Sequence, residues 1–277
     1  MQAPRARVGR AHPVPVTGAR RRALLAPLVA TGAALLELVL AGGCAGCVVG
    51  AASAQGDRSL CAGCREALGG SAQPAWPTPV PPGLPRPWAV AAYDGPARAA
   101  LLSHKEDGRL SLAGPLGDAL ARSVRAAVAS ASSSGRPTVR GAVVGLVPVP
   151  SRPAATRARG HDPTRRLAQR AAAALRSEVD AEWSAQVLPV VRVARGLADQ
   201  AGLDARQRAV NLDGALMVPD RLSRLVRGRV VVVVDDVITT GASIGETSRV
   251  LRAAGADVVG AAVVAATVRR LPPGLCV

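Results

Sequence analysis

The feature that most constrains the fold is a run of five valines, residues 230–234, which ends in the adjacent acids Asp235 and Asp236. β-Branched side chains favour strands, and an unbroken apolar run fits a strand that is buried on both faces of a parallel sheet. In open sheets of this kind, ligands bind beyond the carboxyl ends of the strands, where turns lead into helices. The sequence therefore predicts that the two carboxylates lie at such a rim.

A short turn follows the two acids and opens a helix that we predict over residues 244–254. Its residues are Thr239, Thr240, Gly241, Ala242 and Ser243. Amide N–H groups and hydroxyls converge at a helix start, where the helix dipole favours an anion. Two carboxylates beside such a turn fit a sugar phosphate, because vicinal hydroxyls can donate to the acids while the phosphate enters the turn. The alternative is an ordinary buried strand that ends in a polar turn.

Strand-like apolar runs alternate with helical periodicity along most of the chain. We predict strands near residues 89–92, 141–150, 187–194, 230–234 and 256–268, with helical segments over 96–131 and from residue 163. This alternation predicts an α/β fold, a parallel sheet flanked by helices. The chain has 277 residues, 49% of them apolar, and no phenylalanine, so the core must be built from Ala, Val and Leu.

Four of the five cysteines form two CxxC pairs, Cys44 with Cys47 and Cys61 with Cys64, with 13 residues between the pairs. Two such knuckles can supply a tetrahedral set of four sulfurs for Zn²⁺. Four sulfurs leave no open position for catalysis, so we expect a structural site whose metal contributes folding free energy. Two disulfides in a secreted protein, or a redox pair, are the alternatives. Cys276 is left unpaired.

The N-terminal residues combine basic and apolar segments. Residues 1–22 hold six arginines and no acid, which fits a solvated arm or a nucleic-acid contact. Residues 23–43 superficially resemble a signal peptide or a membrane span, but Glu37 lies within them and a CxxC pair follows at once. Such a charge costs about 2.5–3.5 kcal/mol on insertion. We therefore predict a helix over residues 35–40 that packs on the main body, no membrane span, and a cytoplasmic protein.

Composition also divides the chain. Residues 69–88 contain seven prolines, which forbid a regular helix and predict an extended connector. The predicted parts are a basic and apolar arm (1–34), a helix with the four cysteines (35–68), a proline-rich linker (69–88) and the main domain (89–277). The net charge of +16 suits a polyphosphorylated small molecule as well as a nucleic acid.

The segment VVVVDDVITTGAS resembles the phosphoribosyl-pyrophosphate (PRPP) motif of the type I phosphoribosyltransferases. Three further segments resemble the ComF family of competence-associated proteins, which carry a four-cysteine zinc module before a phosphoribosyltransferase domain. These are LLELVLAGGCAGC, PVPSRPAATRARGHDPTRRLA and QAGLDARQRAVNLDGAL. The likeness spans about residues 35–268, with its matched segments in order.

The resemblance implies a type I phosphoribosyltransferase-like sheet that binds PRPP with Mg²⁺. Asp235 and Asp236 would hold the ribose hydroxyls, and residues 239–243 the 5′-phosphate. A base or amine would displace pyrophosphate from C1 through an oxocarbenium-like transition state, and either acid could stabilise the developing positive charge. Positioning and charge stabilisation would supply the catalysis.

For the pyrophosphate, the resemblance implies the turn with Pro150, Ser151 and Arg152. Arg159 and Gly160 stand in the place of the family's RG pair. Arg208, in a segment expected over the active site, and Lys105 are further ligands, although each could be an ordinary surface residue. The other residues of that segment which match the family are Gln200, Leu203 and Asn211. His161 is more in keeping with a structural role. Leu216 replaces the usual aromatic residue, which leaves base recognition open.

A second class of function is a non-catalytic phosphoribosyltransferase fold that acts in DNA uptake or recombination through single-stranded DNA or protein partners. The cysteines, the arginine-rich start and the ComF resemblance favour it. A zinc-dependent nuclease or deaminase is the weakest reading, because the chain lacks an HxE motif or a comparable open metal site. The acceptor substrate and the oligomeric state stay open, with a homodimer as one option.

Overall fold

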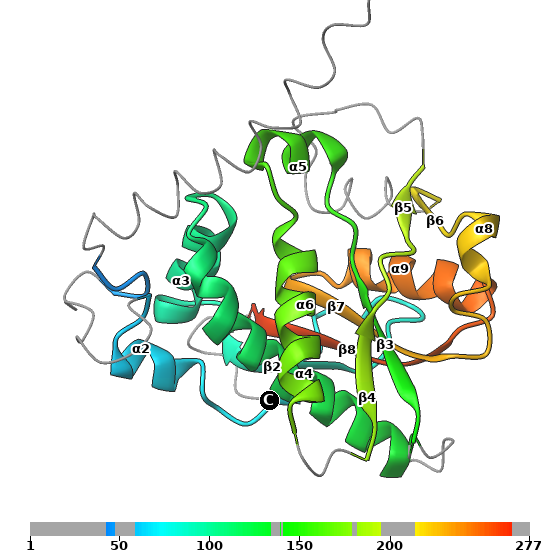
Figure 1. Ribbon diagram of the computed structural model, residues 1–277, viewed down its shortest axis with the longest axis horizontal. Helices are drawn as coiled ribbons and strands as arrows, with labels where there is room; N and C mark the ends of the chain where they lie inside the picture. Colours follow the sequence, from blue (N-terminus) through cyan, green and yellow to red (C-terminus); the bar gives the residue numbers. More distant parts are fainter. Residues whose placement is uncertain are drawn as a thin grey trace, which may run out of the picture. The chain divides into compact units, whose positions relative to one another are not determined.

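The computed structural model describes residues 43–47, 59–133, 139, 141–178, 182–194 and 214–267, all of which belong to one compact unit, Gly43–Val277. The main sheet has the order β1-β2-β8-β7-β3-β4 (Figure 1). Its strands are β1 (Gln73–Pro74), β2 (Pro87–Ala92), β3 (Val143–Pro148), β4 (Ser184–Val187), β7 (Val230–Ile238) and β8 (Asp257–Ala266). Every neighbouring pair is parallel except β1 with β2, so the predicted α/β class is confirmed.

Helices precede, connect and flank these strands. They are α2 (Ala62–Ala67), α3 (Gly95–Lys105), the 3₁₀ turn η1 (Leu110–Leu112), α4 (Ala113–Ser133), α5 (Pro153–Arg159), α6 (Pro163–Arg176), α8 (Asp220–Ser223) and α9 (Ala242–Ala253). A separate antiparallel pair joins β5 (Arg192–Val193) to β6 (Leu216–Met217). Among the described residues, no helix is long and apolar enough to cross a membrane.

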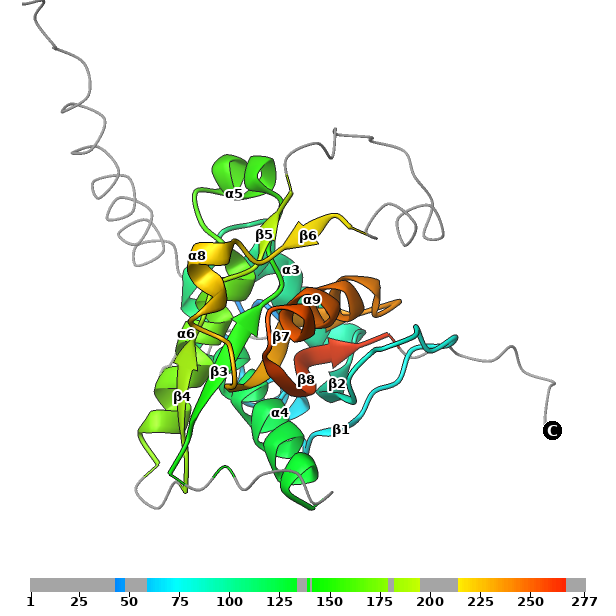
Figure 2. The ribbon, with the colours of Figure 1, turned by 90° about the vertical axis from the view of Figure 1, so that its right-hand side faces the viewer.

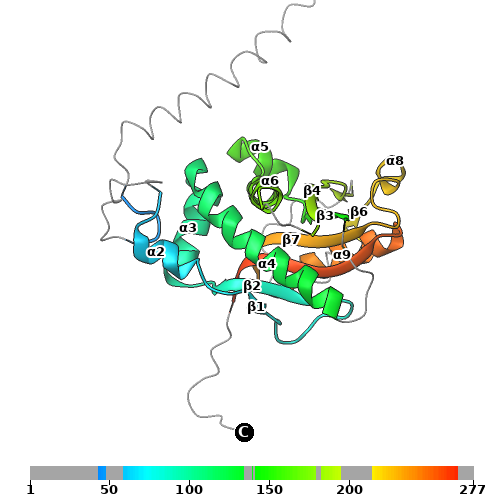
Figure 3. The ribbon, with the colours of Figure 1, turned by 60° about the horizontal axis from the view of Figure 1, so that its bottom comes forward.

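Strand β7 is buried on both faces, as its valine run predicts. Val232 and Val234 belong to a core cluster that includes residues of α4 and α6, whereas Val231 and Val233 belong to a second cluster with residues of α9. Side chains alternate between the two faces of a strand, so one run of valines can serve both clusters. Figure 3 shows α4 and α6 over one face of the sheet, and Figure 2 shows α9 beside β7 and β8.

Helix α6 begins as the sequence predicts. Asp162 is the N-cap residue, and its carboxylate accepts a hydrogen bond from the backbone N–H of Arg165, while Pro163 occupies the first turn. Leu167, Ala171 and Leu175, spaced four apart, are all buried. Helix α6 therefore presents one apolar stripe to the core and leaves its N-terminus beside the carboxyl end of β3.

The connections leave the sheet in opposite directions on either side of the boundary between β3 and β7. From β3, the chain crosses through α5 and α6 to β4 at one edge, whereas from β7 it crosses through α9 to β8 on the other side. A ligand crevice is expected where the strand order reverses in this way, at the carboxyl ends of the two strands. Of the predicted ligand residues, Ser151 follows the end of β3, and Asp235 and Asp236 lie in the last four residues of β7.

The observed elements differ from the predicted ones in several places. Strand β7 extends beyond the predicted residues 230–234 to Ile238 and so includes both acids. The apolar run 187–194 is divided between the end of β4 and the short strand β5, because residues 188–191 lie between them in no regular structure. Helix α5 was not predicted. Its seven residues include no buried side chain, so no apolar periodicity marks it. The predicted helix over residues 35–40 lies outside the described residues.

Gly117 marks the closest approach of α4 to α6. A Cβ atom at this position would overlap the Cβ of Arg170 and lie 3.3 Å from the amide nitrogen of Ala171. We expect Gly117→Ala to lower the free energy of unfolding by about 1–2 kcal/mol, because the overlap outweighs the gain in helix propensity. Gly245→Ala in α9 is the matched control, since its Cβ would meet open space. The control should gain about 0.5–1 kcal/mol in a denaturant titration, and equal effects of the two variants would contradict the packing described here.

Candidate functional site

The candidate site lies where β3 separates from β7. The two strands pair as far as Pro148 opposite Val234, and the N–H of Val149 donates to the carbonyl of Val234 at 2.9 Å. Beyond that point β7 continues alone on this side, while its pairing with β8 extends to Ile238. Asp235 and Asp236, called the acid pair below, are the first residues of β7 past the separation. Their position at an open strand edge agrees with the rim predicted from the sequence.

Asp236 is held by contacts to both of its carboxylate oxygens. Its Oδ2 accepts from the Nζ of Lys105 at 3.1 Å, and its Oδ1 accepts from the backbone N–H of Val237 at 2.8 Å. The residue is 8% exposed, whereas the side chain of Lys105 is 38% exposed. Burial would lower the pKa of Lys105, but the charge and the hydrogen bond of Asp236 raise it above the usual lysine value. The lysine is therefore a fixed cation at the acid pair.

The negative charge of the Asp235 carboxylate is less well compensated than that of Asp236. Its Oδ1 accepts from the backbone N–H of Asp236 at 2.9 Å and from the hydroxyl of Thr164 at 3.4 Å. Burial raises the pKa of Asp235 well above its usual range, and the negative charge of Asp236 raises it further. A cation or a hydroxyl donor brought to this carboxylate would relieve both effects, which is a common property of ligand-binding acids.

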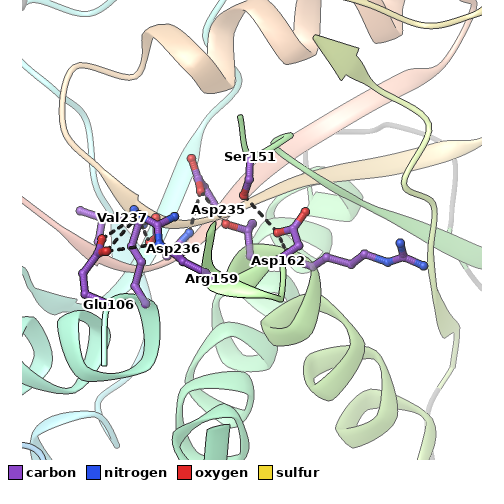
Figure 4. Close-up of polar contacts among 10 residues, drawn as sticks. Glu106, Ser151, Arg159, Asp162, Asp235, Asp236 and Val237 are labelled. Carbon is purple, nitrogen blue, oxygen red and sulfur yellow. Dashed lines mark hydrogen bonds and ion pairs between the residues drawn. The ribbon is translucent and has the colours of Figure 1, made fainter. Parts of the chain in front are cut away.

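Two further polar contacts surround the acid pair (Figure 4). Glu106, next to Lys105 at the end of α3, pairs with Arg159 of α5 through contacts of 2.9 to 3.2 Å. The hydroxyl of Ser151 donates to the carboxylate of Asp162 at 3.1 Å. Asp162 also caps α6, the helix that brings Thr164 to Asp235. The ends of α3, α5 and α6 thus meet at the carboxyl ends of β3 and β7.

The anion turn, residues 239–243, follows β7 directly and leads into α9. Thr239 and Thr240 are exposed, and the hydroxyl of Thr240 accepts from the N–H of Ala242 at 3.4 Å. Gly241 has φ of +76°, which only glycine adopts readily. A Cβ atom there would lie 3.1 Å from Leu84 and 3.2 Å from Pro77. The proline-rich connector is therefore packed against the anion turn, a contact that its composition did not predict.

The structure brings together most of the residues predicted for this site. Lys105, Ser151 and Arg159 all come from segments that end beside the acid pair. Arg152 is an exposed residue at the N-cap position of α5. The predicted ligand segment around Arg208 lies outside the part of the chain that the structure describes. Sequence reasoning missed Glu106, Asp162 and Thr164. For Asp162 a signal existed, since Asp followed by Pro predicts a helix start.

The second candidate site is the cysteine cluster, made of Cys44, Cys47, Cys61 and Cys64. Their sulfur atoms all lie within 4.8 Å of one another, and the Sγ atoms of Cys47 and Cys61 are 3.7 Å apart. All four are free thiols. This donor set and spacing fit a tetrahedral Zn²⁺ ion, so the cluster is compatible with the structural zinc predicted from the sequence.

The environment of the cysteine cluster favours a thiolate. Burial acts to raise the pKa of Cys44, but hydrogen bonds from the backbone N–H groups of Cys61 and Gly46 lower it to about 6. Burial, followed by the neighbouring thiols, raises the pKa of Cys64. A divalent cation would stabilise all four thiolates at once, which an empty cluster of this kind cannot do.

Residues 166–273 match the family model described as the phosphoribosyl transferase domain. The match includes α6 from Arg166 onward, the acid pair and the anion turn, and it covers less than half of the chain. No curated protein matched the chain.

The raised pKa of Asp235 predicts a pH-dependent stability. The folded protein binds a proton at this carboxyl more tightly than the unfolded chain does, so the contribution is favourable below the usual Asp pKa of about 3.9 and is lost as the pH rises through the raised value. We expect Asp235→Asn to melt about 2 °C or more above the wild type at pH 7–8, with the difference shrinking toward pH 4. The amide oxygen can still accept from Asp236 and Thr164.

Asp220→Asn is the control for this experiment, because Asp220 is an exposed residue at the start of α8. Thermal melts over pH 4–8 would show parallel curves for the control and the wild type. Parallel curves for Asp235→Asn as well would contradict the raised pKa of Asp235.

Removal of one cysteine should remove the metal. We expect the wild type to bind one zinc ion per chain, and Cys64→Ser to lose zinc and stability, because three sulfurs hold the ion less tightly than four. Cys276→Ser is the control, as this cysteine belongs to neither CxxC pair. Elemental analysis with thermal melts tests this, and full zinc content in Cys64→Ser would refute the site.

Proposed function

Because the chain carries a phosphoribosyl transferase domain, we propose that it binds PRPP at the carboxyl ends of β3 and β7. The acid pair accepts hydrogen bonds from the ribose hydroxyls, and the anion turn binds the 5′-phosphate. The observation that carries the proposal is the arrangement of adjacent carboxylates at the open edge of β7, directly before a turn that starts a helix. A pentose phosphate has hydroxyl donors and a terminal anion at matching ends.

The cations around the acid pair suit the pyrophosphate end of the same ligand. Lys105 is already positioned beside Asp236, and Ser151 and Arg152 follow β3. Arg159 pairs with Glu106, and it could exchange this carboxylate partner for a phosphate, which arginine binds with similar geometry. Arg208 is the further pyrophosphate ligand that the sequence predicts.

Mg²⁺ is the cofactor proposed for this site. Carboxylate and phosphate oxygens are the ligands that Mg²⁺ prefers, and Asp235 has a carboxylate whose charge is poorly compensated. When bound with PRPP, the ion would neutralise charge on the diphosphate. The chain's own contribution is to hold the ribose and both anionic ends of PRPP in a fixed orientation.

The proposed reaction is transfer of the phosphoribosyl group to a base or amine. A nitrogen of the acceptor forms a bond to C1 of the ribose, the bond from C1 to the pyrophosphate oxygen breaks, and pyrophosphate leaves with the electron pair. The acceptor nitrogen loses its proton to solvent. The acid pair, on the ribose side, stabilises the positive charge that develops on the sugar.

The cysteine cluster supports a narrower assignment. A four-cysteine zinc module before a phosphoribosyltransferase domain is the arrangement implied by the ComF resemblance, and the cluster precedes the matched region in this chain. We extend the proposal to that family, to a cytoplasmic location that keeps thiols reduced, and to a role in competence that involves single-stranded DNA or protein partners. The division of the chain at residues 34, 68 and 88 is part of the same proposal.

Loss of both carboxylates should abolish PRPP binding. We expect the double variant Asp235→Asn, Asp236→Asn to bind PRPP with Mg²⁺ about 100-fold more weakly or worse, since each charged hydrogen-bonding group contributes about 1.5–3 kcal/mol. Isothermal titration calorimetry measures this, with Asp220→Asn as a control that leaves the crevice unchanged. Retained affinity in the double variant would refute the assigned ribose site.

Two measurements, of pyrophosphate release and of binding to single-stranded DNA, distinguish the catalytic from the non-catalytic function. Pyrophosphate release from PRPP and Mg²⁺ with a panel of bases and amines supports transfer. PRPP binding with no release, together with salt-dependent binding to single-stranded DNA, supports the DNA-associated role.

A further inference from the structure

Helix α3 lies between the cysteine cluster and the acid pair. Figure 1 shows α2, which carries Cys64, beside α3, and the two helices are in contact. At the opposite end of the contacts described here, the C-terminal turn of α3 supplies Lys105, which donates to Asp236. A single helix of 11 residues therefore touches both candidate sites.

The buried residues of the cysteine segment are part of the main hydrophobic core. Cys44 and Cys64 are buried, 8% and 4% exposed, and they share one core cluster with Ala97 and Leu101 of α3. Leu60 and Leu68, each 1% exposed, belong to the same cluster. Helix α4 adds a polar tie, since Arg122 donates to the carbonyl of Leu68 at the end of α2. A change in the shape of the cysteine cluster must therefore be transmitted to the core face of α3.

A chain of hydrogen bonds joins the two sites more directly. The guanidinium of Arg109 donates to the carbonyl of Gly43, the residue before Cys44, at 3.1 Å. The carbonyl of Arg109 accepts from Nδ1 of His104 at 3.3 Å, and its N–H donates to the carbonyl of Ser103 at 3.1 Å. Arg109 thus connects the first knuckle of the cluster to the last turn of α3.

His104 extends this chain of contacts toward the residues beside the acid pair. Its ring is 1% exposed and lies 5.8 Å, centroid to centroid, from the ring of His161, which follows the Arg159-Gly160 pair. The next two residues, Lys105 and Glu106, bind Asp236 and Arg159. The residues that would surround pyrophosphate are therefore fixed to the same turn that Arg109 ties to the cysteine segment.

We propose that zinc at the cysteine cluster and PRPP at the acid pair stabilise the same position of the C-terminal turn of α3, so that each ligand strengthens the binding of the other. Arg109 and His104 act as positioning residues in this coupling. The inference rests on the proposed function, since it takes PRPP as the ligand of the acid pair. Coupling between two binding sites is reciprocal, so the same factor must appear in both affinities.

Two measurements on the full chain test the coupling. In the first, calorimetry compares the Kd for PRPP with Mg²⁺ in the zinc-loaded protein and after removal of zinc with a zinc-selective chelator. In the second, a chromophoric zinc chelator follows the rate of zinc release from the loaded protein with and without PRPP and Mg²⁺. We expect PRPP affinity to fall about fivefold or more without zinc, and PRPP to slow zinc release, because the same coupling stabilises the zinc-loaded state.

The variant Arg109→Ala separates coupling from simple stabilisation. It removes the tie to Gly43 but none of the four sulfurs and no residue of the acid pair. We expect it to retain zinc and to bind PRPP, while PRPP no longer slows zinc release. Arg125→Ala is the matched control, because Arg125 pairs on the exposed side of α4 with Glu178. This control should keep the wild-type effect of PRPP on zinc release.

The outcomes distinguish the two levels of the proposal. If the zinc-loaded protein does not bind PRPP, both the proposed function and the coupling fail. If it binds PRPP with the same Kd and releases zinc at the same rate in every condition, only the coupling fails. Circular dichroism checks the fold of the zinc-free protein, and if that protein unfolds, the release experiment on the loaded protein decides alone.

Discussion

Electrostatic repulsion between two adjacent carboxylates is the constraint on which the rest of the site depends. Asp235 and Asp236 lie within β7, directly after four fully buried valines (residues 231–234), so they cannot turn away into bulk water without breaking the pairing of β7 with β8. Lys105 compensates Asp236, and backbone N–H groups and Thr164 support both acids, yet the pKa of Asp235 stays raised. The proposed ligand, with its hydroxyl donors and a cation, would compensate the charge that the protein leaves uncompensated. Buried charge that the protein leaves uncompensated is typical of a binding site and would be costly in a purely structural turn.

The topology explains why the polar residues and the uncompensated charge gather at one place. Strand β3 pairs with β7 only as far as Val234, and the connections from the two strands then pass to opposite faces of the sheet. Strands β3 and β7 separate at that point, whereas they are paired along the buried valines of β7. Three helix ends meet there, from α3, α5 and α6, and each contributes a polar residue to the contacts around the acid pair. On the far side, the connector closes the anion turn, since Pro77 and Leu84 leave no room for a side chain at Gly241.

The position of the cysteine cluster would give a bound zinc ion an effect beyond local stability. Its buried residues join the core that supports α3, and α3 supplies the lysine of the acid pair. In a chain without phenylalanine, cores are filled by small aliphatic side chains, and a metal-bound segment is one way to add a rigid packing surface. Zinc content and ligand affinity would then vary together, which has a practical consequence for anyone who purifies the protein in the presence of chelators.

The sequence by itself determined the α/β class, the valine strand that leads into the acid pair, the glycine-bearing turn, the helix beginning at Pro163 and the two CxxC pairs, but not that the strand continues to Ile238. These are local properties, since valine runs, helix caps and CxxC spacing act over a few residues. It also singled out Lys105 and Ser151, but it could not join Lys105 to Asp236, because that contact spans 131 positions in the chain. The same limit applies to Glu106 with Arg159, to Thr164 with Asp235, and to the connector under Gly241. Only the tertiary structure decides such contacts, because they depend on where the helix ends converge once α4 and α6 have packed on the sheet.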